Sequence, residues 1–119
     1  MTAAGPAARV GTDLPMLLAH VAEIYALGDV RCWSVLTTGY EDCNLDVATS
    51  DLRVVVKVFA RDRAPGIAVR TAELITAAQA AGVRHPRLYR DRAGDLVHTH
   101  AGHQVLVMDF VPGRTLYDL

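Results

Sequence analysis

Lys57 is the residue of this sequence whose position most directly suggests chemistry. Eleven of the twelve basic residues are arginine, and Lys57 is the only lysine. It lies inside a run of valines and alternates with Val55 and Phe59 on one face of a predicted strand. An ammonium group on a half-buried strand face is costly unless it meets an anion or a carboxylate. Two interpretations remain open: a phosphate-binding lysine, or a lysine on an edge strand whose charged end reaches water.

A loop farther toward the N-terminus, between the first and second predicted strands, has the sequence Gly-Tyr-Glu-Asp-Cys-Asn and contains Gly39, Tyr40 and Asn44. Because it connects the first two predicted strands, it is placed to cover phosphate groups held by Lys57. Its one glycine and two carboxylates, which repel a triphosphate, are equally compatible with an ordinary hairpin turn. The loop therefore supports a phosphate site only in combination with the lysine.

The end of the last predicted strand is a second candidate binding segment. Met108, Asp109, Phe110 and Val111 follow an apolar run and precede a Pro-Gly pair that ends the strand. Backbone N–H and C=O groups that leave a sheet in this way suit the hydrogen-bonding edge of a purine. An ordinary strand end is the alternative.

Three histidines are candidates for an unrelated metal site. His98 and His100 project from one face of a predicted strand, and a two-residue turn places His103 opposite His100. Three imidazoles on one hairpin face suit Zn²⁺ or a similar ion. The alternative is an exposed hairpin whose histidines have no common role. His20 and His85 have no visible partner in the sequence and are interpreted as structural.

The surrounding sequence predicts the order helix, three strands, helix, two or three strands, the possible extra strand preceding a turn at residues 92–95. Apolar residues recur at helical spacing between Asp13, an N-cap, and Gly28, a stop. A second helix is predicted over residues 67–81, ended by Gly82. The predicted strands lie at residues 32–38, 43–49, 53–60, 96–100 and 104–110. This order indicates the α+β class, with a five-stranded antiparallel sheet, an N-terminal helix and one helix between the third and fourth strands.

Length and composition exclude several classes of protein. The chain has 119 residues, of which 51% are hydrophobic, and a net charge of −1. This balance does not indicate non-specific nucleic-acid binding, and no apolar run suits a membrane span or a signal peptide. Cys32 and Cys43 lack metal or redox spacing, so we expect reduced thiols and a cytoplasmic protein. We expect residues 1–12 to be flexible and residues 13–119 to form one domain.

Taken in order, these segments resemble the amino-terminal lobe of the aminoglycoside phosphotransferase superfamily, which includes homoserine, choline and hydroxylysine kinases. The Gly-Tyr-Glu-Asp-x-Asn loop is similar to that of the homoserine and hydroxylysine kinases. The resemblance covers about residues 13–119 and rests on the order and spacing of short motifs. These motifs are Tyr-Ala-Leu-Gly-Asp-Val at 25–30, the segment 39–47, Val-Val-Val-Lys-Val-Phe at 54–59, Gly-Val-x-His-Pro at 82–86, Gly-Asp at 94–95 and the segment 107–116.

This resemblance implies a protein-kinase-like N-terminal lobe that binds ATP and Mg²⁺. It implies that Lys57 contacts the nucleotide phosphates, that the loop at 39–44 covers them, and that the backbone of residues 108–111 holds adenine. In the whole enzyme, the γ-phosphoryl group of ATP passes to the hydroxyl of a small molecule. The alternative from another class is a non-catalytic remnant or interaction module that self-associates. Neither nucleic acid nor a membrane is expected as a partner.

Two features depart from the family pattern. Family kinases pair the lysine with a helix glutamate eleven residues before the glycine that ends the helix. Counting back from Gly82 gives Thr71, and the nearest acid is Glu73, so these two residues are the possible lysine partners. Either a shifted helix brings Glu73 to Lys57 or no pair forms, and we expect no pair. The family's His-Gly-Asp-type catalytic loop is not in the sequence, whose only asparagine is Asn44. We therefore expect no catalytic residue and no Mg²⁺ ligand here, and a C-terminal lobe in cis or in trans, or self-association, as the partner.

Overall fold

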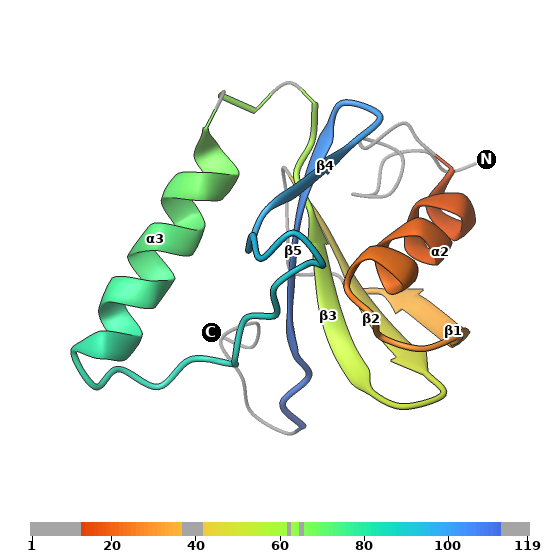
Figure 1. Ribbon diagram of the computed structural model, residues 1–119, viewed down its shortest axis with the longest axis horizontal. Coiled ribbons are helices and arrows are strands. Elements are labelled where there is room, and N and C mark those ends of the chain that lie inside the picture. The colour runs from red at the N-terminus through yellow and green to blue at the C-terminus, as the bar shows by residue number, and fades with distance from the viewer. Residues whose placement is uncertain (1–12, 37–41, 62, 65, 113–119) are drawn as a thin grey trace.

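A five-stranded antiparallel sheet forms the centre of the fold, in the strand order β1-β2-β3-β5-β4 (Figure 1). The computed structural model describes residues 13–36, 42–61, 63–64 and 66–112. Its elements are α2 (Leu14–Ile24), β1 (Val30–Val35), β2 (Cys43–Thr49), β3 (Arg53–Val58), α3 (Ile67–Ala80), β4 (His98–His100) and β5 (His103–Asp109). The predicted α+β class, strand number and helix positions are confirmed. Within the described residues, neither helix is long and apolar enough to cross a membrane.

Helix α2 covers one face of the sheet. It begins where the Asp13 carboxylate accepts a hydrogen bond from the backbone N–H of Met16 at 3.2 Å, as an N-cap does. Leucines and a valine at helical spacing then form a buried stripe, because residues three and four apart share a helix face. This stripe packs on alternate residues of the three central strands, which are Cys43, Leu45, Val47, Val54, Val56, Val58, Val105 and Val107.

Helix α3 lies on the opposite side of the sheet from α2 (Figure 1). Its small residues Ala68 and Ala72 are buried against Phe59 and Leu106, which are side chains of the sheet's second face. Only these two residues of α3 are buried, so the helix touches the sheet through a narrow strip. The second face of the sheet is therefore covered by α3 only in part, and Lys57 lies on this face.

The last hairpin differs in its bounds from the predicted one. Strand β4 begins at His98 rather than at residue 96, because the chain near Tyr89 already pairs with β5 farther along. The Tyr89 N–H donates to the Val107 carbonyl at 2.9 Å, and the Asp109 N–H donates to the Arg87 carbonyl at 2.9 Å. Two segments thus share one edge of β5. Strand β1 also differs: it begins at Val30 instead of residue 32, and residues 37–38 lie outside the described part.

We predict that truncating the α2 stripe destabilises the fold strongly. Leu18 is 1% exposed, so Leu18→Ala removes buried methyl groups and leaves a cavity between α2 and the sheet. The expected loss in the free energy of unfolding is about 2–5 kcal/mol. Met16, on the same helix but 70% exposed, supplies the control: Met16→Ala should change stability by no more than about 0.5 kcal/mol. Urea unfolding measures both, and similar losses in the two variants would contradict this packing.

Candidate functional site

Lys57 lies on a central strand of the sheet. Strand β3 is hydrogen-bonded to β2 on one side and to β5 on the other, and Lys57 pairs with Asn44 and Leu106. The interpretation of Lys57 as a lysine on an edge strand is therefore wrong. Its side chain is 25% exposed and lies on the sheet face opposite α2, together with Phe59. The charge must consequently find a partner on that half-covered face.

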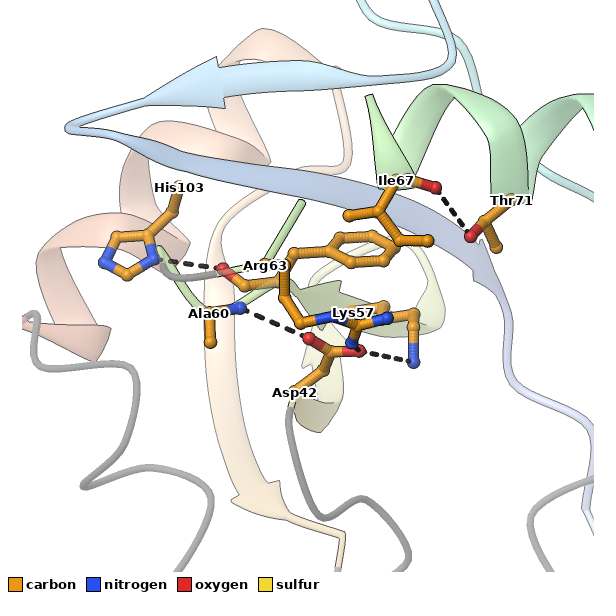
Figure 2. Close-up of polar contacts among 8 residues, drawn as sticks. Asp42, Lys57, Ala60, Arg63, Ile67, Thr71 and His103 are labelled. Carbon is orange, nitrogen blue, oxygen red and sulfur yellow. Dashed lines mark hydrogen bonds and ion pairs between the residues drawn. The ribbon is translucent and has the colours of Figure 1, made fainter. Parts of the chain in front are cut away.

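The partner of Lys57 is Asp42, which immediately precedes β2. The Asp42 Oδ2 atom lies 3.6 Å from the Lys57 Nζ atom and forms a second, closer ion pair with the Arg63 guanidinium. Its Oδ1 atom accepts a hydrogen bond from the backbone N–H of Ala60 at 3.2 Å. Figure 2 shows the three groups converging on this carboxylate from β3 and from the segment that leads to α3. We call Asp42, Lys57, Arg63 and the Ala60 N–H the Asp42 cluster.

The two cations of the Asp42 cluster are more exposed to solvent than its carboxylate. The Asp42 side chain is 8% exposed, whereas those of Lys57 and Arg63 are 25% and 22% exposed. Two cations and one carboxylate leave a formal charge of +1, and both cations keep part of their surface accessible. The cations also lie over the Phe59 ring, at 5.4 Å for Lys57 and 5.9 Å for Arg63. This arrangement suits an anion that approaches from solvent.

Sequence reasoning identified Lys57 but missed Asp42 and Arg63 as its partners. It treated the carboxylates of the loop only as groups that repel phosphate. A signal was nevertheless present: a short turn joins β2 to β3, and its register pairs Cys43 with Val58. Continued by one residue, that register places Asp42 opposite Phe59, just past the end of β3. Arg63 carried no comparable signal, because it lies in an irregular segment.

The two helix residues considered as possible lysine partners lie away from the ion pair that Lys57 makes with Asp42. Glu73 is exposed and lines the groove between α3 and the segment before β4. The Thr71 hydroxyl donates to the Ile67 carbonyl at 2.8 Å, within its own helix (Figure 2). Among the described residues, the carboxylate bound to Lys57 comes from the β2 side of the site and not from α3.

Asn44 lies beside Lys57 and carries an unsatisfied polar atom. The two residues are direct partners across β2 and β3, so their side chains share one face. Asn44 is 4% exposed, and its Oδ1 atom has no hydrogen-bond partner among the described residues. A buried acceptor left unpaired costs about 1–3 kcal/mol. Its neighbours in the loop, Gly39 and Tyr40, lie outside the described residues.

The segment proposed to bind adenine is partly engaged in the sheet. The Asp109 N–H donates to Arg87, and the Phe110 N–H donates to the Arg53 carbonyl at 3.2 Å. Both N–H groups are therefore already hydrogen-bonded within the protein. The Asp109 carboxylate accepts from the Tyr89 hydroxyl, and burial raises the pKa of Tyr89. Met108 is buried and Val111 is 37% exposed.

The sequence suggested an apolar strand end at Phe110, but a charged side chain lies against its ring. The Arg53 guanidinium stacks over this ring at 3.7 Å from its centroid. The hydrogen bond from Arg53 to Asp46 raises the pKa of Arg53, so the stacked cation keeps its charge. A planar base would have to share the ring with, or displace, this guanidinium.

The predicted pairing of His103 with His100 across the hairpin is confirmed, but the three histidines do not form a metal site among the described residues. His103 is fully buried, and its Nδ1 atom hydrogen-bonds the Phe59 carbonyl at 3.1 Å (Figure 2). His98 and His100 instead contact His20 of α2, which sequence reasoning had left without a partner. Within the part of the chain that the structure describes, no group of three or more His, Cys, Asp or Glu side chains could hold a metal ion.

No family model and no curated protein sequence matches this chain. The site must therefore be interpreted from its own geometry. That geometry brings together Lys57, Asp42, Arg63 and Asn44, and leaves Glu73, Thr71 and the histidines outside it.

We predict that the Asp42 carboxylate contributes more to stability than a surface carboxylate does. Asp42→Asn leaves Lys57 and Arg63 without their counter-charge, although both retain some contact with water. We expect the free energy of unfolding to fall by about 1–3 kcal/mol, as measured by urea unfolding. Asp46→Asn is the matched control, because its partner Arg53 has a side chain that is 55% exposed. A smaller loss is expected there, and equal losses in the two variants would contradict a special role for Asp42.

Proposed function

We propose that this chain is the nucleotide-binding lobe of an ATP-dependent small-molecule phosphotransferase of the aminoglycoside phosphotransferase type. In the whole enzyme, the γ-phosphoryl group of ATP would pass to a hydroxyl of the acceptor. The observation that carries the proposal is the position of Lys57. It is the only lysine of the chain, and it lies part-buried on the central strand with its charge held at the start of β2. Its side chain keeps a quarter of its surface accessible to an anion.

Arg63 extends this proposal to a second phosphate-binding cation. It shares the Asp42 carboxylate with Lys57, so one anion can contact both side chains. An arginine donates two parallel hydrogen bonds to phosphate oxygens, whereas a lysine acts as a point charge. The formal charge of +1 attracts phosphate, but Asp42 competes with it for the same donors. Binding by this lobe alone is therefore expected to be weak.

Asn44 gives independent support for a ligand at this face. Its buried Oδ1 atom lacks a partner, and the side chain is next to Lys57 across the strand pair. Rotation of the amide exchanges the carbonyl and NH₂ ends, so the same side chain can donate to a phosphate oxygen or accept from a ligand hydroxyl. A ligand there would remove the cost of the unpaired atom.

The described residues suit the phosphate groups of ATP better than they suit Mg²⁺. The phosphate groups of ATP suit Lys57 and Arg63, and adenine would have to rely on the carbonyl groups of residues 109–110, because their N–H groups are engaged. For Mg²⁺, the described residues contain no group of three or more His, Cys, Asp or Glu side chains that could hold a metal ion. The metal would thus depend on groups outside the described residues, such as those of a C-terminal lobe in cis or in trans.

A non-catalytic interaction module remains the second candidate, and α3 supplies the observation that favours it. A largely apolar groove of about 550 Å³ runs between α3 and the segment before β4, and Val69 is 45% exposed at its wall. Leu74, also on α3, is 62% exposed. Self-association through this helix would need no nucleotide. Sedimentation of the purified chain distinguishes this candidate, because dimerisation would be lost in a Leu74→Ser variant.

We predict that the purified chain binds ATP with a Kd of about 1 mM or weaker and transfers no phosphoryl group. Substituting Lys57→Met should lower the affinity at least about tenfold, because one charged hydrogen bond to phosphate is lost. Asp42→Asn should act in the opposite direction and raise the affinity, since it removes the competing carboxylate. The measurement is an NMR titration with ATP, inorganic tripolyphosphate and adenosine as separate ligands.

The matched control for this prediction is Arg61→Met. Arg61 is exposed and donates to the Ala101 carbonyl at 2.6 Å, outside the Asp42 cluster, so its loss should leave the affinity unchanged. Equal effects of Lys57→Met and Arg61→Met would mean that phosphate responds only to net charge. Binding of adenosine without any response to tripolyphosphate would remove the phosphate site from the proposal.

A further inference from the structure

Three histidines meet where α2 packs against β4, on the sheet face opposite the Asp42 cluster. The Nε2 atoms of His20 and His98 face each other at 2.9 Å. The rings of His20 and His100 are stacked, with centroids 4.0 Å apart and planes inclined by 23°. We call these three residues the histidine cluster. It joins elements that are 78 residues apart in the sequence, measured from His20 to His98, and the proposed nucleotide site makes no use of it.

We propose that the histidine cluster is a proton-sensitive contact that holds α2 against β4 while the facing imidazoles share one hydrogen, and loosens when both are protonated. The proposal goes beyond the nucleotide-binding function and does not depend on it. It rests on the face-to-face nitrogen pair, on the stacked third ring and on the buried helix that this contact adjoins.

The hydrogen bond between His20 and His98 can exist in only some protonation states. The Asp91 Oδ2 atom lies 3.4 Å from the His98 Nδ1 atom, which favours a hydrogen on Nδ1 and a lone pair on the His98 Nε2. The His20 Nε2–H group then donates to that lone pair. If His98 gains a proton, the bond survives with its direction reversed, because neutral His20 can accept. If both rings are protonated, two N–H groups face each other, no acceptor remains, and two positive charges repel.

The surroundings of His20 favour its neutral form. Burial lowers the pKa of His20 below 6.5, and repulsion from His100 and His98 lowers it further. On its own helix, Glu23 acts in the opposite direction, and Arg92, from the segment before β4, adds to the lowering. His103 on β5 pairs with His100 across the hairpin, and its Nδ1 atom hydrogen-bonds the Phe59 carbonyl at 3.1 Å.

The segment before β4 also fixes the position of the carboxylate that faces His98. The Asp91 Oδ1 atom accepts hydrogen bonds from the backbone N–H groups of Ala93 at 3.0 Å and Asp95 at 2.9 Å. Burial raises the pKa of Tyr25, with Asp91 and Asp95 adding to the rise, so this phenol stays neutral and donates to the Leu96 carbonyl at 2.9 Å. Tyr25 therefore stays hydrogen-bonded and uncharged beside the histidine cluster, and the imidazoles are the side chains of this contact that can take up a proton in mild acid.

The sign of the pH dependence follows from the direction of the His20 shift. A histidine whose pKa is lower in the folded state binds protons more readily in the unfolded chain. Its contribution to stability is complete above about pH 6.5 and is lost as the pH falls through the pKa of the folded state. The contact adjoins Leu17, Leu18 and Val21, which are buried against the sheet, so its loss would expose apolar surface of α2. Mild acid thus becomes a means of releasing α2 from the sheet.

The experiment compares the wild-type chain with His20→Gln and with His85→Gln as the matched control. His85 is half-buried and its Nδ1 atom contacts only the adjacent Pro86 carbonyl at 2.8 Å, remote in sequence from the cluster. Urea midpoints are measured at about pH 7.5 and about pH 5.5. We expect the midpoint of the wild type and of His85→Gln to fall at the lower pH, and that of His20→Gln to fall clearly less. Amide exchange of α2, corrected for the intrinsic pH effect, should accelerate more than that of β3.

A histidine titration followed by NMR tests the proposal even if His20→Gln fails to fold. The proposal expects the His20 ring to titrate below pH 6.5. A His20 ring that titrates at or above this value would overturn it. So would identical pH-dependent losses of stability in the wild type and His20→Gln, or acceleration of exchange spread equally over α2 and β3.

Discussion

The central strand β3 imposes the main constraint on this fold. Val54, Val56 and Val58 face α2, and Val55 on the other face is also fully buried, so the strand is covered on both sides along most of its length. Lys57 places a charge within this apolar run. Because β2 and β5 flank the strand on both sides, the charge does not lie at an edge of the sheet. A lysine in such a place requires a counter-charge, and Asp42 supplies it.

The Asp42 carboxylate connects three segments that are separate in the sequence. Its carboxylate meets a strand residue, a backbone N–H group just after that strand, and an arginine on the way to α3. The start of β2 and the route of the chain toward α3 are thus set by one buried group. A ligand that competes for Lys57 and Arg63 would act on the same group. Binding of an anion at this site would therefore be coupled to the conformation around the start of β2 and the segment before α3.

The two faces of the sheet carry different kinds of polar groups. The face toward α3 holds the Asp42 cluster and Asn44, with two cations accessible to solvent. The face toward α2 holds the histidine cluster at its edge, beside a continuous apolar core. A binding site needs accessible charge and incomplete coverage, and the narrow contact of α3 allows both. A proton-sensitive contact needs partial burial and close packing, and these occur where α2 meets β4.

The sequence by itself determined the elements and their order. The valine run around Lys57 and the helical spacing between Asp13 and Gly28 are local patterns, which can be read without knowing how the elements pack. The α+β class, the antiparallel sheet and the place of Lys57 on one strand face could therefore be predicted. The bounds of β4 could not, because the segment around Tyr89 competes for the same edge of β5.

Only the tertiary structure decided which groups meet. The short turn between β2 and β3 gave a signal for Asp42, but Arg63 reaches Lys57 through an irregular segment whose path the spacing of residue types does not specify. His20 meets His98 because α2 packs across the sheet edge, whereas His103, adjacent on the hairpin, turns toward Phe59. Pairings between distant residues depend on how helices and strands pack, since sequence spacing specifies a face of an element but not the element that covers it.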